Sequence, residues 1–163
     1  MSIAGDLKPY ARLDQLMVEQ GLAASRSRAA DAVARGVVFV DGLRAGKAAL
    51  KIAPSAIITL DDPAAPYVSR AALKLIAALD AFGFSPQGLR ALDIGASTGG
   101  FTQVLLERGA HQVYAVDVGH EQLHPLLKRD PRVINCEGVN ARSLSETEID
   151  APFQAIVSDV SFI

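Results

Sequence analysis

The chain has few of the residues that would place it in several common protein classes. Its 163 residues include no tryptophan and one cysteine, Cys136, so no disulfide can form within the chain. Three histidines lie apart without metal-ligand spacing, and we expect no metal site. No apolar run reaches the ~18 residues of a membrane-spanning helix, and the N-terminus lacks a signal-peptide core. These absences favour a cytoplasmic protein in a reducing compartment.

Charge is small overall but unevenly distributed. The net charge is −2 and the isoelectric point is near 5.9. Residues 8–51 hold eight basic and four acidic side chains, a net charge of +4, whereas residues 69–163 hold eight basic and eleven acidic ones, a net charge of −3. A basic segment followed by an acidic one predicts two domains with separate functions.

The most informative segment is a glycine-rich turn. A largely apolar stretch, 89–94, leads into Gly95-Ala96-Ser97-Thr98-Gly99-Gly100-Phe101, after which apolar residues recur at helical spacing. A strand, a tight turn and a helix can present backbone N–H groups to a nucleotide-like ligand, and glycine leaves room for its approach. We therefore predict that the cofactor is bound by Gly95, Ser97, Gly99, Gly100 and Phe101.

An acidic residue at a suitable distance supports this prediction. Asp117 ends the apolar segment 112–116 and lies 22 residues after Gly95. That spacing is close to the ~20 residues at which a carboxylate binds ribose hydroxyls. The glycines read G-x-x-x-G-G, and no Walker lysine follows, so a phosphate-free cofactor, S-adenosylmethionine, is favoured over a dinucleotide. The alternative is a glycine-rich turn in a ligand-free α/β protein.

Apolar periodicity predicts a small α+β domain followed by a Rossmann-like α/β domain. The first has helices at 13–19 and 25–34, the second of them capped by Ser25 or Ser27, and strands at 37–40 and 56–60. The segment 61–66 contains two prolines and two acids and reads as a stiff linker. We place the domains at 10–61 and 69–163, with 62–68 between them.

Helices and strands alternate in the second domain, which predicts a parallel sheet. The expected helices are 70–82, capped by Ser69, 101–108 and 122–129, and the expected strands are 89–94, 112–116, 132–136 and 155–159. Cys136 is expected to be buried within its strand. Doubly wound domains have about six strands, so four strands predict an incomplete domain. Its last strand, near Val157, would then be an unprotected edge that promotes self-association, with Phe162 also exposed.

Several motifs resemble known families. Arg12-Leu13-Asp14, Gly21-Leu22-Ala23, Ser25-Arg26-Ser27-Arg28 and Gly36-Val37-Val38 look like the RNA-binding domain first named from small-subunit ribosomal protein S-four. Tyr67-Val68-Ser69-Arg70-Ala71-Ala72-Leu73-Lys74-Leu75, the Gly95 turn and Asp159-Val160-Ser161-Phe162-Ile163 resemble the TlyA (haemolysin A) family, which has an FtsJ-like catalytic domain. The resemblance covers residues 12–163.

The resemblance implies 2′-O-methylation of ribose in ribosomal RNA, with S-adenosylmethionine as methyl donor. FtsJ-like enzymes use a Lys-Asp-Lys-Glu tetrad, of which Lys74 matches the first lysine and Asp159 the aspartate. The other two members would lie beyond Ile163, so we expect this chain by itself to be inactive. Asn140 occupies the position where related enzymes hold the adenine ring. A ribose hydroxyl is a weak nucleophile, and a lysine held by a carboxylate could orient and deprotonate it.

Basic residues of the first domain are the candidates for binding ribosomal RNA. Arg26 and Arg28 stand at the start of a predicted helix, where backbone N–H groups also favour phosphate. Together with Arg12 and Lys47 they would form a surface that reads RNA shape. The alternative is a solvated helix face.

Two other functions stay open at this point. One is a non-catalytic RNA-binding protein with a residual cofactor fold, which the missing half of the tetrad would favour. The other is a membrane-lytic haemolysin, which the absence of an amphipathic cationic helix disfavours.

Overall fold

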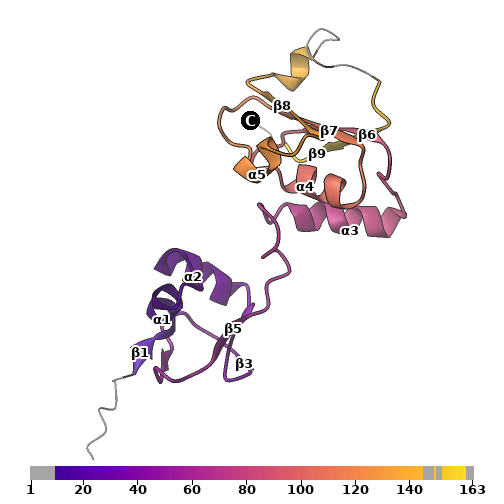
Figure 1. Ribbon diagram of the computed structural model, residues 1–163. Helices are drawn as coiled ribbons and strands as arrows, with labels where there is room; N and C mark the ends of the chain where they lie inside the picture. The colour runs from indigo at the N-terminus through magenta and orange to yellow at the C-terminus, as the bar shows by residue number, and fades with distance from the viewer. Residues whose placement is uncertain (1–9, 145–148, 150–151, 161–163) are drawn as a thin grey trace, which may run out of the picture. The chain divides into compact units, whose positions relative to one another are not determined.

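The chain forms two compact units. The computed structural model describes residues 10–144, 149 and 152–160 (Figure 1). The N-terminal unit is Met1–Asp62 and the C-terminal unit is Pro63–Ile163, so the division falls inside the proline-containing segment 61–66. Each unit has its own hydrophobic core.

Two helices pack against short antiparallel strands in the N-terminal unit. The helices are α1 (Leu13–Glu19) and α2 (Arg26–Ala34). The strands are β1 (Ala11–Arg12), which pairs with β4 (Lys51–Ile52), and β2 (Val38–Val40), which lies between β3 (Leu43–Arg44) and β5 (Ile58–Leu60). Leu13, Met17 and Val38 are fully buried between these layers.

Local chemistry explains where the second of these helices begins. The Ser25 hydroxyl accepts a hydrogen bond of 3.3 Å from the backbone N–H of Arg28, one of the donors that a helix start leaves unpaired. The predicted helices 13–19 and 25–34 are thus confirmed. Sequence analysis missed β1, β3 and β4, because a two-residue strand is too short to show alternation.

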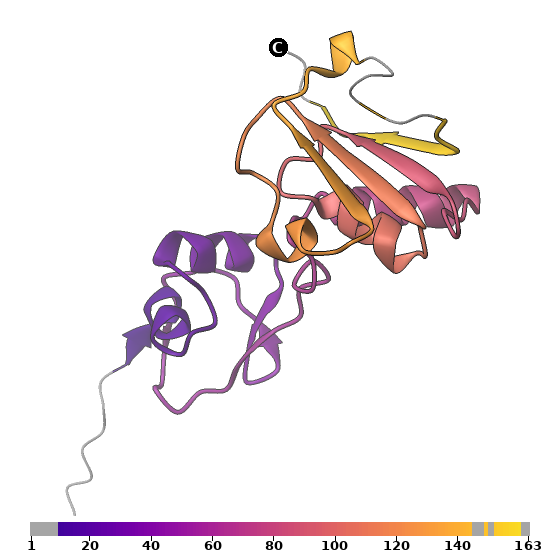
Figure 2. The same ribbon diagram turned by 45° about the horizontal axis from the view of Figure 1, so that its top comes forward.

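The C-terminal unit is a parallel sheet with helices on one face. Its strands are β6 (Arg90–Ile94), β7 (Gln112–Asp117), β8 (Val133–Glu137) and β9 (Ala155–Ser158), in the order β8-β7-β6-β9. The helices α3 (Ala72–Phe82), α4 (Gly100–Glu107) and α5 (Pro125–Lys128) supply Leu75, Leu105 and Leu127 to the core (Figure 2). The predicted parallel α/β architecture is confirmed.

The other face of the sheet is covered by the chain that follows β8. This segment includes a short 3₁₀ helix, η1 (Ala141–Ser143). Farther along, Ile149 and Phe153 pack with Leu92 and Tyr114 of the sheet, and Phe153 meets the Tyr114 ring edge-on at 5.1 Å between centroids. Both faces of the central strands are therefore buried, as parallel sheets require.

Three local predictions differ from the structure. The helix expected at 122–129 is limited to Pro125–Lys128, because the backbone N–H groups of Gln122 and Leu123 donate to the Glu137 carboxylate instead of joining a helix. The helix expected from residue 70 begins at Ala72. The Ser69 hydroxyl accepts a hydrogen bond from the backbone N–H of Ala71, the residue just before the helix. Cys136 is partly rather than fully buried, because β8 is an edge strand of the described sheet.

The other edge of the described sheet is β9. Its exposed apolar side chain is Ile156, at 63% exposure, whereas the predicted Val157 is half-buried on the opposite face. Phe162 lies outside the described residues. Self-association through this edge stays a prediction.

Candidate functional site

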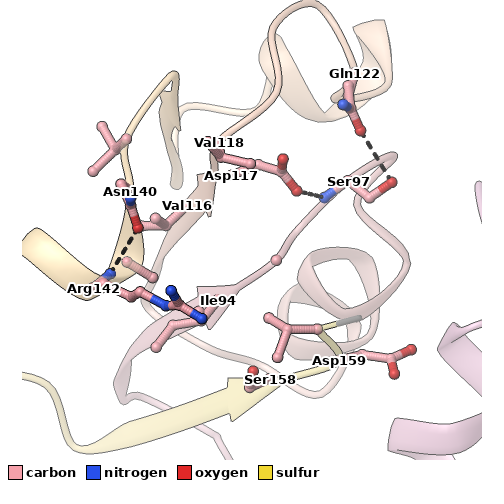
Figure 3. A pocket seen from close by; sticks show the side chains of 14 residues that line it. Ile94, Ser97, Val116, Asp117, Val118, Gln122, Asn140, Arg142, Ser158 and Asp159 are labelled. Atoms are coloured by element: carbon pink, nitrogen blue, oxygen red, sulfur yellow. Dashed lines mark hydrogen bonds between the residues drawn. The ribbon is translucent and has the colours of Figure 1, made fainter. Parts of the chain in front are cut away.

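The carboxyl ends of the parallel strands surround one cavity of about 590 Å³. Because these strands run in the same direction, the loops that follow them meet at one edge of the sheet. Five predicted site residues line the cavity: Gly95, Ser97, Asp117, Asn140 and Asp159 (Figure 3). They lie at the ends of all four strands or in the loops that follow, so the tertiary fold brings them together.

The turn after β6 is fastened to β7 through its backbone. The N–H groups of Gly95 and Ala96 both donate to the Val116 carbonyl, at 2.8 and 3.0 Å, and that of Ser97 donates to Asp117 Oδ2 at 2.8 Å. These three N–H groups are thus used within the protein, and presentation of the turn's N–H groups to a ligand stays a prediction. Glycine is required at position 95 for another reason: φ is +81°, and a Cβ would lie 2.8 Å from Val160 Cγ1.

Gly99, Gly100 and Phe101 do not line the cavity. A Cβ on Gly99 would clash with Leu127 of α5, and one on Gly100 would lie 2.9 Å from Ser69 Cβ. Phe101 is 9% exposed and belongs to the core. These residues allow α4 to pack closely against its neighbours, and their contact with a cofactor stays a prediction.

Asp117 is held in place at the end of β7. Besides the Ser97 N–H, its carboxylate accepts the N–H of Gly119 at 2.8 Å on Oδ1. Ser97 has a left-handed φ of +49°, so the carboxylate also supports a strained turn. Each carboxylate oxygen can accept a further hydrogen bond, such as one from a sugar hydroxyl.

Asn140 and Arg142 approach the cavity from the segment after β8 (Figure 3). The Asn140 side-chain oxygen accepts the N–H of Arg142 at 3.0 Å and caps η1, which leaves its amide NH₂ as a donor. Sequence analysis missed Arg142. It is the one cationic side chain among the lining residues of the described cavity, and its guanidinium forms no ion pair within residues 10–144, 149 and 152–160.

Lys74 and Asp159 form an ion pair beside the cavity. Lys74 Nζ, from α3, donates to both carboxylate oxygens, at 2.9 and 2.7 Å, across a sequence separation of 85 residues. The side chains are 67% and 35% exposed. Asp159 lines the cavity and Lys74 does not, so the ion pair with Asp159 is what connects Lys74 to the cavity.

A carboxylate that sequence analysis missed lies in β6, close to the turn. Asp93 is 1% exposed, and its Oδ2 accepts the Thr102 hydroxyl at 2.7 Å. Burial raises the pKa of Asp93 to about 6, and the negative charges of Asp117 and Asp159 act in the same direction. An acid one residue before the end of an apolar strand is the only sequence signal for it.

The predicted RNA-binding residues fall into two pairs. Arg12 and Arg26 both form ion pairs with the buried Asp14, at 2.8 and 3.1 Å. Their hydrogen bonds, that of Arg12 above all, hold the pKa of Asp14 well below its usual range. Arg28 and Lys47 are exposed, and their side chains form no ion pair in the described part of the N-terminal unit.

Within the described residues, no group of three or more His, Cys, Asp or Glu side chains could hold a metal ion. Nor does that part of the chain contain a helix long and apolar enough to cross a membrane.

Comparison with known families agrees with this architecture. The FtsJ-like methyltransferase family matches residues 67–163, which is more than half of the chain, and the S4 domain matches residues 11–58. The chain therefore belongs to the FtsJ-like methyltransferase family and carries an N-terminal S4 domain. The family implies a methyl donor of the S-adenosylmethionine type.

Individual relatives narrow the resemblance to TlyA and haemolysin A, as predicted. The 16S/23S rRNA (cytidine-2′-O)-methyltransferase TlyA of Mycobacterium tuberculosis is 47% identical over 94% of this chain and 58% of its own length. Hemolysin A of Brachyspira hyodysenteriae is 44% identical over 93% of this chain and 63% of its own. A solved structure from Streptococcus thermophilus has a TM-score of 0.56 and 41% identity over 87% of this chain and 52% of that one. The chain thus spans less than two thirds of each relative.

Proposed function

We propose that this chain takes part in S-adenosylmethionine-dependent 2′-O-methylation of ribose in ribosomal RNA. The observation that carries the proposal is the cavity at the strand ends, where a ribose-type carboxylate, Asp117, and an amide, Asn140, lie beside the Lys74–Asp159 pair. The name of the mycobacterial relative, a 16S/23S rRNA (cytidine-2′-O)-methyltransferase, supports the same reaction.

The cavity suits S-adenosylmethionine in size and chemistry. Ligand pockets commonly have volumes of about 300–1,000 Å³ and mostly apolar walls with a few polar groups. Ile94, Val116 and Val118 supply apolar wall here, Asp117 can accept from ribose hydroxyls, and the Asn140 amide can donate to a ring nitrogen. When bound, the cofactor would supply a methyl group on a positively charged sulfur.

The Lys74–Asp159 pair would act on the ribose hydroxyl. Two N–H bonds of Lys74 are committed to Asp159, so the third can donate to the 2′-oxygen and stabilise the negative charge that develops there. Asp159 fixes the direction of that donor. The expected role of the pair is therefore positioning and charge stabilisation, with Lys74 as the group in contact with the hydroxyl.

The N-terminal unit would bind the RNA backbone. Its candidate contacts are Arg12, Arg26, Arg28 and Lys47, all at least partly exposed. Cationic side chains bind phosphate without regard to base identity, so this unit would hold ribosomal RNA while the C-terminal unit carries out the chemistry.

The test is transfer of labelled methyl groups to unmodified ribosomal subunits by the protein. We expect Lys74→Ala to lower transfer by about 100-fold or more, the scale of a lost donor to a developing oxyanion, with cofactor affinity retained. The matched control is Arg108→Ala, which breaks an exposed ion pair between the residue that caps the end of α4 and Asp80 of α3, away from the cavity. Full transfer by Lys74→Ala, or label recovered on a base instead of the 2′-oxygen, would contradict the proposal.

A further inference from the structure

One buried carboxylate connects two arginines from separate elements of the N-terminal unit. Asp14 lies in the first turn of α1 and is 4% exposed. Arg12 Nε and Nη2 donate to its Oδ1 and Oδ2, at 3.0 and 2.8 Å. Arg26, the first residue of α2, donates to Oδ2 from Nη2 at 3.1 Å and more weakly from Nε at 3.4 Å. We call these three residues the Asp14 clamp.

The clamp leaves both guanidinium groups accessible. The Arg12 and Arg26 side chains are 44% and 57% exposed, whereas the Asp14 side chain is 5% exposed. Solvent therefore meets two cations with the anion behind them, for a net charge of +1. A guanidinium has five N–H donors in one plane, so bonds to Asp14 fix its plane and direct the remaining donors outward.

A clamp that served only to join α1 to α2 would not need two half-exposed arginines. A buried ion pair is weak evidence for stability, because desolvation offsets much of the attraction. Oriented guanidinium groups on a surface, in contrast, match the geometry of phosphate oxygens, and lysine cannot replace arginine in such bidentate contacts. The accessible face of the clamp thus has the chemistry of a phosphate receptor.

We propose that Asp14 is a positioning residue that sets Arg12 and Arg26 as one paired receptor for neighbouring phosphates of folded RNA. This inference rests on the proposed RNA-binding function of the N-terminal unit. Arg28 and Lys47, which no described side chain holds, contribute charge without fixed direction. The clamp therefore determines which RNA shapes bind well, and the free cations determine how strongly any RNA is attracted.

Removal of the Asp14 charge has opposite effects on the two kinds of binding. Asp14→Asn deletes an anion behind the receptor, which strengthens attraction to any phosphate backbone, and it frees the two guanidinium groups to rotate. We expect affinity for a regular RNA duplex to stay equal or rise, while affinity for structured ribosomal RNA falls about tenfold, the change equivalent to one lost charge-assisted hydrogen bond.

The experiment measures binding of the full chain to transcribed 16S and 23S ribosomal RNA and to a perfectly paired duplex, across a salt series. Asp14→Asn is compared with Arg28→Ala, which should flatten the salt slope by about one for both RNAs and leave their affinity ratio unchanged. Unfolding midpoints are recorded so that only folded protein is compared. Arg26→Lys is a second variant: lysine keeps the positive charge at this half-exposed position but lacks the planar, forked donors of a guanidinium. It should lower the ratio of affinities for ribosomal RNA and duplex without changing the salt slope.

The outcomes separate the clamp from the function on which it rests. A lowered ratio in folded Asp14→Asn and in Arg26→Lys supports the clamp. An unchanged ratio in both variants, with wild-type binding intact, would overturn the positioning role and leave Asp14 as a structural tie. If wild-type protein shows no salt-dependent RNA binding, the RNA-binding assignment and the clamp both fail.

Discussion

Asp14 in the N-terminal unit and Asp93 in the C-terminal unit are both buried carboxylates, yet their pKa values are shifted in opposite directions. Asp14 faces two arginines, whose hydrogen bonds hold its pKa well below the usual range. Asp93 accepts a hydrogen bond from the Thr102 hydroxyl. Burial raises its pKa to about 6, and the negative charges of Asp117 and Asp159 act in the same direction. The difference shows that burial alone does not set the charge of an acid, because the groups packed against it decide whether ionisation is supported.

The two units extend this contrast to their candidate binding groups. In the N-terminal unit, an anion orients exposed cations, which suits a phosphate-bearing ligand. In the C-terminal unit, backbone N–H groups orient Asp117, which suits a ligand with hydroxyl groups. In each unit the binding group is thus oriented by a partner of opposite polarity. Substitutions in the N-terminal unit should change RNA binding, and those in the C-terminal unit should change cofactor binding.

The largest expected effect is the loss of stability from Asp14→Asn. Removal of charge-assisted hydrogen bonds to Arg12 and Arg26 should lower the free energy of unfolding by about 2–3 kcal/mol at pH 7. Because the folded pKa is depressed, this stabilisation is present above the unfolded pKa of about 4 and is lost as pH falls below it. Urea unfolding at pH 7 and pH 3 should show the variant's deficit shrinking in acid.

Asp80→Asn is the control for that comparison. It breaks an exposed pair with Arg108 and should leave the urea midpoint almost unchanged, because water and salt screen such pairs. An equal loss in both variants would mean that burial adds nothing to the Asp14 pairing.

The next largest effect concerns cofactor affinity. Asp117→Ala should weaken S-adenosylmethionine binding by about 1–3 kcal/mol, the scale of a lost hydrogen bond to a charged group together with a loosened Ser97 turn. Isothermal titration calorimetry measures the change. Asp130→Ala is the matched control, since this acid pairs with Arg132 and does not line the cavity. Equal affinity of Asp117→Ala and wild type would remove Asp117 from the site.

Asp93→Asn should shift stability in the direction opposite to Asp14→Asn. The folded pKa is raised to about 6, so the folded protein binds more protons between pH 4 and 6 and wild-type stability falls as pH rises through that window. At pH 8 an amide avoids the buried charge and can still accept from Thr102, so the variant should gain as much as about 2 kcal/mol. Thermal unfolding at pH 5 and pH 8 measures this gain, and a loss at pH 8 would contradict it.

The smallest expected effect is that of Arg142→Ala. This side chain lines the cavity but lacks the buried anion that holds Arg12 and Arg26, so it should contribute charge more than direction. We expect the salt slope of RNA binding to flatten by about one. Filter binding is the measurement, and Arg142→Lys should restore the slope. If Arg142→Lys fails to restore the salt slope, Arg142 binds RNA through directed guanidinium hydrogen bonds and not through its charge alone.

Much of the fold could be predicted from the sequence because its signals are local. Helical periodicity located α1 and α2, and the Gly95 turn with Asp117 22 residues later located the strand ends that surround the cavity. These patterns depend only on residues close together in the sequence and on the side-chain periods of helix and strand. The shortened α5 was not predictable, because a carboxylate on β8 takes the N–H groups that would have extended it.

By itself, the sequence determined the two helices of the N-terminal unit, the parallel sheet of the C-terminal unit and the position of the turn, since these follow from backbone geometry and local apolar spacing. Only the tertiary structure decided the state of each charged group. It brought Lys74 next to Asp159, 85 residues away in the sequence, and hydrogen-bonded N–H groups of the turn to β7. It also placed Asp14 between two arginines and Asp93 beside a hydroxyl. The reason is physical: a side chain's charge and orientation depend on the groups packed around it, and those groups come from distant parts of the chain.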